Sequence, residues 1–166
     1  MAQARLKEVV NASTRTAVAE SDGGVQSTIT TPTGHSWIID EPPSRGGRDE
    51  GAAPLEHFTA SLASCQMVQV VKVAEAMRFR HGAIRITADI GTNMVVRDEE
   101  KNLLLRFTEA EMTIDIETEE PDAKLERLAV LAEDRCPVGT LLGDGGIEVK
   151  CTWNRLPLPE AAPANA

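Results

Sequence analysis

The feature that most constrains this fold is a long apolar helical pattern, which lies between two groups of strand-like segments. Its apolar side chains recur every three or four residues, with alanines between them: Leu55, Phe58, Leu62, Cys65. Such spacing is typical of an α-helix. Pro54 suits the first turn, where its missing N–H is not needed. We expect a helix from Pro54 to about Met77, buried at the centre of the fold because it is apolar on most sides up to Val73.

The residues before this helix indicate short strands. Val25 to Thr31 and Ser36 to Ile39 have β-type composition, and Pro32 and Gly34 lie between them. We expect an N-terminal β-meander there. The following segment, Glu41 to Gly51, is rich in proline, glycine and charge, and we expect a mobile loop.

Two strands are predicted after the helix. Apolar and polar residues alternate from Ile84 to Ile90, which is the pattern of a half-buried strand. In the next strand the apolar residues Leu105 and Phe107 have odd numbers, whereas those from Ala110 onward have even numbers. The apolar face can stay inward only if one residue is extra, so we predict a β-bulge near Thr108 or Glu109.

The last third of the chain indicates two helices and a strand. A striped apolar pattern predicts a helix from Pro121 to about Arg135. Pro137 can begin a short helix through Leu142, closed by Gly143, and Ile147 to Trp153 alternate as a strand. The order of elements predicts an α+β fold with antiparallel sheets around a long central helix.

Length and charge restrict the class of protein. The chain has 166 residues, 42% of them hydrophobic, and a net charge of −9. We expect a single domain over residues 1–156 and a disordered tail over residues 157–166. The negative charge argues against binding to nucleic acid or anionic lipid. Neither an export signal nor a membrane-spanning run is apparent, so we expect a cytoplasmic protein.

The three cysteines, Cys65, Cys136 and Cys151, are an odd number, which argues against a structural disulfide framework. They are far apart without a CxxC pair, so we expect no zinc or other metal site. Cys151 lies on the apolar side of an alternating strand, which favours a core position. A cysteine in an alanine-rich helix, such as Cys65, is also commonly a small buried hydrophobe.

Cys136 has a local geometry with chemical consequences. It precedes Pro137, which excludes it from the α region and places it at the N-cap of the short helix. Unpaired N–H groups and the helix dipole favour negative charge there, so we expect a stabilised thiolate. Arg135 would add to this effect, whereas Asp134 and Glu133 would oppose it.

Two segments together resemble the OsmC/Ohr family. Pro54 to Cys65, PLEHFTASLASC, resembles the family's Pro-x-Glu-Leu-Leu-x-Ala-Ala-Leu-x-x-Cys helix, and Arg135 to Val138 resembles its Cys-Pro-Val turn. The resemblance extends over roughly Val25 to Trp153. It implies an OsmC-like fold and an intertwined homodimer, with two sites near the subunit interface that each pair a peroxidatic with a resolving cysteine.

The resemblance implies a thiol peroxidase without a metal or organic cofactor. Cys65 would attack an organic hydroperoxide to form a sulfenic acid, and Cys136 would resolve it as a disulfide. A dithiol, a lipoyl group in the Ohr branch, would then reduce the disulfide. The order of attack stays open, because the N-cap argument favours a thiolate at Cys136 whereas the resemblance selects Cys65.

Activating the nucleophile requires a cation and a hydrogen-bond partner. Glu56 lies about 13 Å along the helix from Cys65 and half a turn round it, so it can reach a thiol only across a dimer; otherwise it is a first-turn residue facing the helix dipole. By resemblance to the OsmC branch, Arg45 is the candidate arginine. Arg48 and Arg15 are competitors, and each arginine can instead be a solvated loop charge.

The sequence also departs from the best-known members of the family. Leu55, and not a glutamate, directly follows the proline, which resembles the less characterised YhfA-like branch. The chain has no tyrosine and three phenylalanines, so a largely aliphatic pocket suited to alkyl or fatty-acid hydroperoxides is expected. The alternatives are a redox sensor or small-molecule binding protein without enzyme activity, and a structural dimer with inert cysteines.

Overall fold

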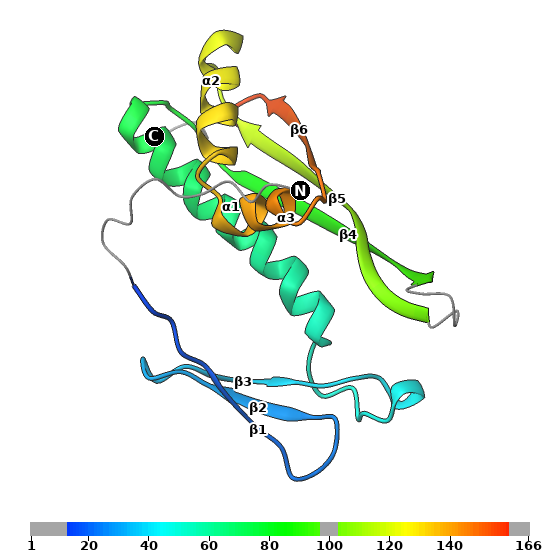
Figure 1. Cartoon of the computed structure of the whole chain (residues 1–166). Coiled ribbons are helices and arrows are strands. Elements are labelled where there is room, and N and C mark those ends of the chain that lie inside the picture. The colour runs from blue at the N-terminus through cyan, green and yellow to red at the C-terminus, as the bar shows by residue number, and fades with distance from the viewer. Residues whose placement is uncertain (1–12, 97–102, 160–166) are drawn as a thin grey trace. The chain divides into compact units, whose positions relative to one another are not determined.

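The structure is a computed structural model that describes residues 13–96 and 103–159. Two compact units are present, Met1–Phe58 and Thr59–Ala166, and each is described separately. The expected single domain over 1–156 stays a prediction, and the expected tail falls largely outside the described residues. The elements (Figure 1) are β1 (Val18–Glu20), β2 (Ser27–Thr30), β3 (Ser36–Ile39), η1 (Pro43–Arg45), α1 (Pro54–Met77), β4 (Ile84–Val96), β5 (Leu103–Glu117), α2 (Asp122–Glu133), α3 (Pro137–Asp144) and β6 (Val149–Leu156).

The first unit contains the predicted β-meander. Strands β1, β2 and β3 form an antiparallel sheet in that order. Gly34 lies in the turn between β2 and β3 with φ of 88°, a left-handed conformation that glycine adopts without a steric cost. The predicted loop contains the short 3-10 helix η1, and its backbone at Gly47 packs closely against its backbone at Glu41. A Cβ at Gly47 would lie 1.7 Å from the carbonyl oxygen of Glu41, so only glycine fits there.

The second unit contains the sheet β4-β5-β6. β4 and β5 pair antiparallel, with Gly91 opposite Glu109 and Thr92 opposite Phe107. Thr108 is therefore the extra residue, and the predicted β-bulge is confirmed. It keeps apolar residues on one face of β5 although their sequence numbers change from odd to even.

β6 is the exception to the expected antiparallel pairing, because it runs parallel to β5, with Met112 opposite Cys151. The connection from β5 to β6 contains α2 and α3, and such a helical crossover returns the chain to the same end of the sheet. This register lies beyond what alternation in the sequence can predict. It brings Cys151 beside the segment that carries Cys136.

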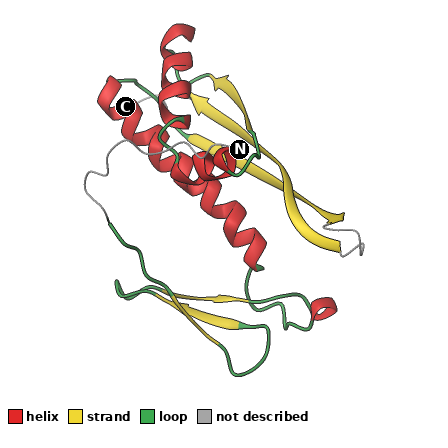
Figure 2. Ribbon diagram, viewed as in Figure 1, coloured by secondary structure: helices red, strands yellow, loops and turns green. Residues whose placement is uncertain are grey.

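The helices of the second unit gather on one side of the sheet (Figure 2). α1 has the predicted bounds, and none of the described helices is long and apolar enough to cross a membrane. The expected central burial of α1 holds for one face of the helix only: Leu62, Val70 and Ala74 are buried, whereas Val68 and Val71 are 47% and 43% exposed. The buried core consists of Val70, Val73, Ala74, Phe79, Ile116, Leu125, Leu128 and Ala132.

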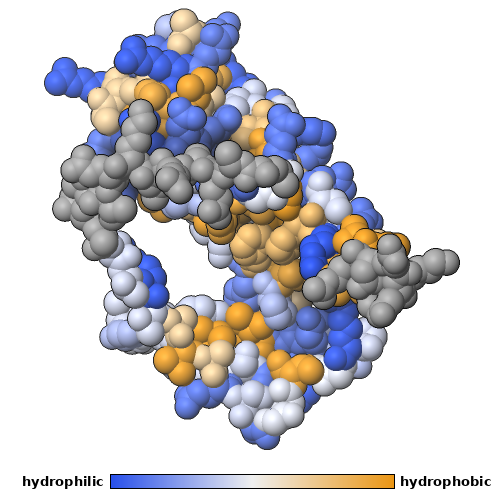
Figure 3. All heavy atoms as spheres, viewed as in Figure 1, coloured by the Kyte–Doolittle hydropathy of each residue, from blue (hydrophilic) through white to orange (hydrophobic). Residues whose placement is uncertain are grey.

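The outer ends of β4 and β5 carry exposed apolar side chains (Figure 3). Met94 and Val96 on β4 are 56% and 61% exposed, and Leu103 and Leu105 on β5 are 56% and 48% exposed. We call these four residues the apolar arm. Groups of exposed apolar residues often mark surfaces that bind a partner.

Candidate redox site

Cys65 and Cys136 lie together in the second unit. Cys65 is half-buried on α1, and Cys136 is 1% exposed at the start of α3. The Cys136 thiol donates a hydrogen bond to the Cys65 sulfur. The fold therefore brings the two thiols that the family resemblance pairs within hydrogen-bond reach of each other.

Cys136 is the N-cap of α3, as predicted. Its backbone, with φ −79° and ψ 102°, is extended, as expected of a residue before proline. The backbone N–H of Gly139 donates to its sulfur at 3.4 Å, and Thr140 N–H donates to its carbonyl oxygen at 2.9 Å. The thiol thus takes the capping role that serine or aspartate has in other helices.

The expected stabilisation of a Cys136 thiolate is wrong. Burial raises the pKa of this thiol from the ordinary 9.0 to about 11. The N–H groups of Gly139 and Val138 lower it, while the hydrogen bond to Cys65 and the charge of that residue raise it. Desolvation outweighs the N-cap effect. A thiolate removed from water loses more solvation free energy than the hydrogen bonds from two backbone N–H groups restore. At neutral pH, Cys136 is a protonated thiol.

Cys151 is a third thiol in the same region. It is half-buried on β6, and its thiol donates a hydrogen bond to the carboxylate of Glu133 at the end of α2. Its pKa is raised to about 12, mainly by burial, and the interactions with Glu133 and Cys136 contribute to the same rise. Cys151 is therefore not a fully buried core residue, as its strand pattern indicated, but part of the surroundings of Cys136.

A pocket of about 240 Å³ lies beside Cys136 and Cys151. Gln66, the residue after Cys65, also lines it and is completely buried. Among the described residues, neither amide atom of the Gln66 side chain has a hydrogen-bond partner. An unpaired buried amide is costly, and this one leaves donors and an acceptor open to a water or a ligand in the pocket. The remaining lining residues are Met112, Glu133, Asp134, Gly139, Thr140, Gly143, Glu148 and Val149.

Glu56 lies in the first unit, in the first turn of α1. Its carboxylate accepts a 2.7 Å hydrogen bond from the backbone N–H of Ala53. This is the helix-terminus role that the sequence left as one alternative. Its role in activating Cys65 stays a prediction.

The candidate arginines also lie in the first unit. Arg45 pairs with Glu41 at 3.4 Å, and its side chain is 65% exposed. Arg48 donates to Gln26 and is 3.8 Å from Glu50. Arg15 donates to the carbonyl oxygen of Thr14. The arginine that serves a redox site therefore stays a prediction.

The loop that carries Arg45 and Arg48 is organised by a buried carboxylate. Asp40 is 1% exposed and accepts hydrogen bonds from the Gln26 side chain and from the backbone N–H groups of Glu41, Arg48 and Glu50. Burial alone would raise the pKa of Asp40, but these hydrogen bonds together lower it. The loop that the sequence predicts as mobile is held at this point.

Three residues of the site were not recognised from the sequence as functional. Gln66 could have been found from the sequence, because it is a polar residue on the same buried helix face as Leu62 and Val70. Cys151 and Glu133 could not, because their proximity depends on the parallel pairing of β6. In the described part of the chain, no group of three or more histidine, cysteine or acidic side chains is placed to hold a metal ion.

Comparison with known proteins shows which family this architecture represents. Residues 47–152 match the family model of OsmC-like proteins, and the chain belongs to this family. No protein of curated function matches the sequence significantly.

Solved structures share the fold. An organic hydroperoxide resistance protein from Elizabethkingia anophelis is 22% identical with a TM-score of 0.67, over 91% of this chain and 100% of that one. The organic hydroperoxide resistance protein OsmC from Legionella pneumophila is 20% identical with a TM-score of 0.65, over 87% and 99%. An OsmC-like protein from Mycoplasma pneumoniae is 15% identical with a TM-score of 0.69, over 87% and 98%.

Proposed function

We propose that this chain is a thiol peroxidase that reduces organic hydroperoxides through Cys65 and Cys136. The hydrogen bond between these two thiols is the observation that supports it most. A peroxidatic and a resolving cysteine must be close enough to form a disulfide, and a direct hydrogen bond meets that requirement.

The protonation of Cys136 supports Cys65 as the attacking residue. With a pKa of about 11, Cys136 holds its proton at neutral pH and donates it in the hydrogen bond to Cys65. A thiol that holds its proton is a poor nucleophile, which leaves Cys65 to attack the peroxide. Cys65 is also the more exposed of the two, so a peroxide reaches it more readily.

The reaction then balances in two steps. The Cys65 thiolate attacks one oxygen of ROOH, the O–O bond breaks, and RO⁻ takes a proton to leave as an alcohol. Cys65 becomes a sulfenic acid. The Cys136 thiol attacks it, the S–O bond breaks, and the Cys136 proton and the hydroxyl leave as water. Two thiol groups, from one dithiol or from two small thiols, then reduce the Cys65–Cys136 disulfide and are themselves oxidised to a disulfide.

The names of the related structures support the choice of substrate. Two of them are organic hydroperoxide resistance proteins, at identities that show the fold alone for this chain. With no tyrosine and three phenylalanines in the sequence, we propose alkyl hydroperoxides as substrates.

We further propose that the active form is a homodimer. The apolar arm is the surface that such an assembly would cover. Glu56 and one arginine, with Arg45 as the first candidate, would serve Cys65 across the subunit interface. Sedimentation equilibrium tests the assembly, and a monomer at micromolar concentration that turns over peroxide would contradict it.

Turnover of cumene hydroperoxide with a dithiol tests the enzyme activity. Cys65→Ser and Cys136→Ser should each lose nearly all turnover, whereas Glu126→Gln, which lies outside the site, should retain it. Without the dithiol, Cys65→Ser should consume no peroxide, whereas Cys136→Ser should consume one equivalent and stop at a sulfenic acid that dimedone traps. Equal turnover in all three variants would remove the mechanism.

A redox sensor is the second candidate. Glu56 is already engaged with the N-terminus of α1, which favours a chain that retains the thiol pair without a catalytic carboxylate. A sensor would be oxidised once per molecule and would accumulate as the disulfide in the presence of dithiol. Sustained turnover under the same conditions excludes this candidate.

A further inference from the structure

We propose that the pocket beside Cys136 receives the thiol that regenerates the enzyme, and that its acidic wall and the unpaired Gln66 amide select a small thiol without negative charge, such as an aminothiol. This inference rests on the proposed function, because it concerns the reduction of the Cys65–Cys136 disulfide. It adds the class of reductant and the sulfur atom that the reductant attacks.

The position of the pocket determines which sulfur is attacked. Cys136 lines the pocket, whereas Cys65 is not among the described residues that form its wall. A thiol seated there therefore reaches the Cys136 end of the disulfide. Cys65 is then the leaving group, and its departure restores the thiolate that the next peroxide requires.

The exchange balances in two steps. The reductant thiolate RS⁻ attacks the Cys136 sulfur, forming a Cys136–S–S–R bond and breaking the bond to Cys65, which leaves as a thiolate. A second thiol of the same class attacks the sulfur of R, forming RSSR and releasing Cys136, which takes up a proton. The two reductant thiols are oxidised to one disulfide, and the protein disulfide is reduced to two thiols.

The charged residues that line the pocket determine which reductant it favours. Glu133, Asp134 and Glu148 line the pocket, and no lysine, arginine or histidine does so among the described residues. A unit charge about 6 Å from one carboxylate in water changes the binding free energy enough for roughly a threefold effect. An amine on the reductant is attracted, and a carboxylate is repelled.

Gln66 supplies the polar anchor. Its amide offers donors and an acceptor, and neither atom has a partner among the described residues. A ligand with a hydroxyl or amine group would pair with the amide and remove the cost of leaving it unpaired. The pocket volume of about 240 Å³ exceeds the ~150 Å³ that holds a benzene-sized molecule, so a short aminothiol fits.

The experiment begins with the full chain in its disulfide form. One equivalent of tert-butyl hydroperoxide should produce the Cys65–Cys136 disulfide, which peptide mass spectrometry detects. If the peroxide fails to do so, the proposed function fails. The same disulfide is then prepared with diamide, so that the reductant pocket is tested independently of the peroxide reaction.

Reduction rates are measured with cysteamine, mercaptoethanol and mercaptopropionate, which carry a positive, zero and negative charge on similar short chains. Each rate is divided by the rate of the same thiol with hydroxyethyl disulfide, which corrects for the intrinsic reactivity of the thiol. The corrected rates should fall in the order given, with cysteamine at least about tenfold faster than mercaptopropionate at low salt. Equal corrected rates would overturn the charge selection.

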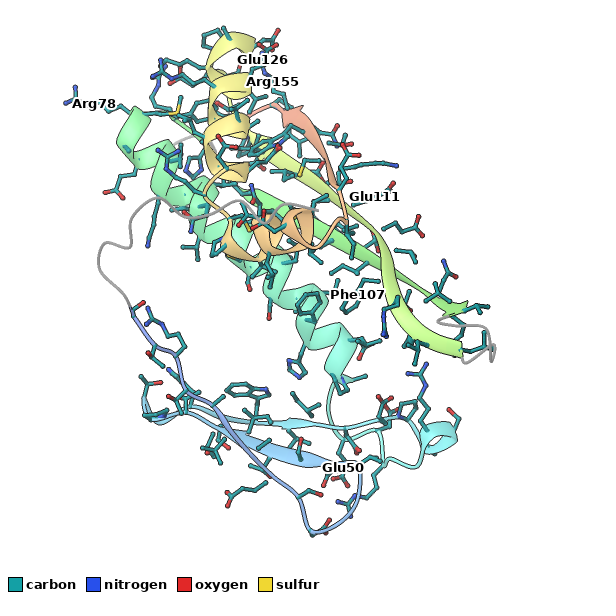
Figure 4. All side chains as sticks on the ribbon, in the orientation of Figure 1. Glu50, Arg78, Phe107, Glu111, Glu126 and Arg155 are labelled. Atoms are coloured by element: carbon teal, nitrogen blue, oxygen red, sulfur yellow. The ribbon has the colours of Figure 1, made fainter. Side chains whose placement is uncertain are left out.

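Matched variants distinguish an effect of the pocket carboxylates from an effect of the net charge of −9. Glu148→Gln should reduce the cysteamine-to-mercaptopropionate ratio by up to about tenfold, because the roughly threefold effect applies to both opposite charges. Glu126→Gln removes the same charge from α2 outside the pocket wall (Figure 4) and should leave the ratio unchanged. An equal effect of the two variants would assign the preference to the net charge of the protein and overturn the pocket.

Two further measurements identify the anchor and the attacked sulfur. Gln66→Leu should slow reduction by cysteamine severalfold, yet raise the melting temperature because an unpaired buried amide is removed. A raised melting temperature with an unchanged rate would overturn the role of Gln66. Rapid alkylation during reduction should trap the reductant on Cys136, and a mixed disulfide found on Cys65 would overturn the proposed direction of attack.

Discussion

The indole nitrogen of Trp153 donates a 2.7 Å hydrogen bond to the carboxylate of Glu133. The same carboxylate accepts a hydrogen bond from Cys151, so two residues of β6 hold one charge at the C-terminal end of α2. A negative charge is unfavourable at that end of a helix. The two donors of β6 compensate for this position and attach the last strand to the helix.

The first prediction concerns this carboxylate. Glu133→Gln should lower the pKa of Cys151, because the charge that opposes the thiolate is removed. The pKa should remain above 9.0, since burial is the largest cause of its rise to about 12. The pH dependence of iodoacetamide alkylation measures it, in a background of Cys65→Ser and Cys136→Ser. Glu126→Gln is the control, and an equal alkylation profile in both variants would contradict the prediction.

Stability at alkaline pH should depend on Cys136. Its folded-state pKa of about 11 lies above the ordinary 9.0, so the unfolded chain loses this proton first as the pH rises. The stabilising contribution is complete below pH 9 and is lost as the pH approaches the folded pKa. Between pH values near 8 and near 11, Cys136 should account for a loss of about 2 kcal/mol in the free energy of unfolding.

Urea unfolding of the reduced protein and of Cys136→Ser at both pH values measures this contribution. The variant should show a smaller alkaline loss of stability than the wild type. Parallel losses in the two proteins would show that the thiol is not kept protonated by the fold.

Close backbone packing in the first unit should make Gly47 irreplaceable. Gly47→Ala places a Cβ 1.7 Å from the carbonyl oxygen of Glu41 and should cost at least about 2 kcal/mol, because the backbone must move. Hydrogen exchange of β2 and β3 should accelerate accordingly. Gly143→Ala is the matched control, since its Cβ meets nothing within 4 Å in α3 and should stabilise the helix by about 0.5–1 kcal/mol.

The core of the second unit should depend strongly on Leu128. This side chain is fully buried between α2 and its neighbours, whereas Val130 on the same helix is 60% exposed. Leu128→Ala should lower the free energy of unfolding by about 2–5 kcal/mol through lost burial and a cavity. Val130→Ala should change it by less than about 0.5 kcal/mol. Chemical denaturation of both variants tests the difference.

Sequence patterns predicted the structure correctly where local residues alone determine the backbone geometry. The change from odd to even apolar positions located the bulge at Thr108, and Pro137 located the N-cap at Cys136. The sign of the Cys136 pKa shift was wrong because it depends on burial, which distant segments produce. The role of Cys151 was missed for the same reason: its neighbours are set by a parallel pairing with β5, which alternation along one strand cannot specify.

Thr108 also restricts how the length of β5 can change. A deletion at this position would remove only the residue that has no partner on β4, so Phe107 would stay opposite Thr92 and on the same face as Ala110. A single deletion elsewhere in the strand would turn the side chains on one side of it to the opposite face. Related chains should therefore lose a residue here more readily than at any other position of β5.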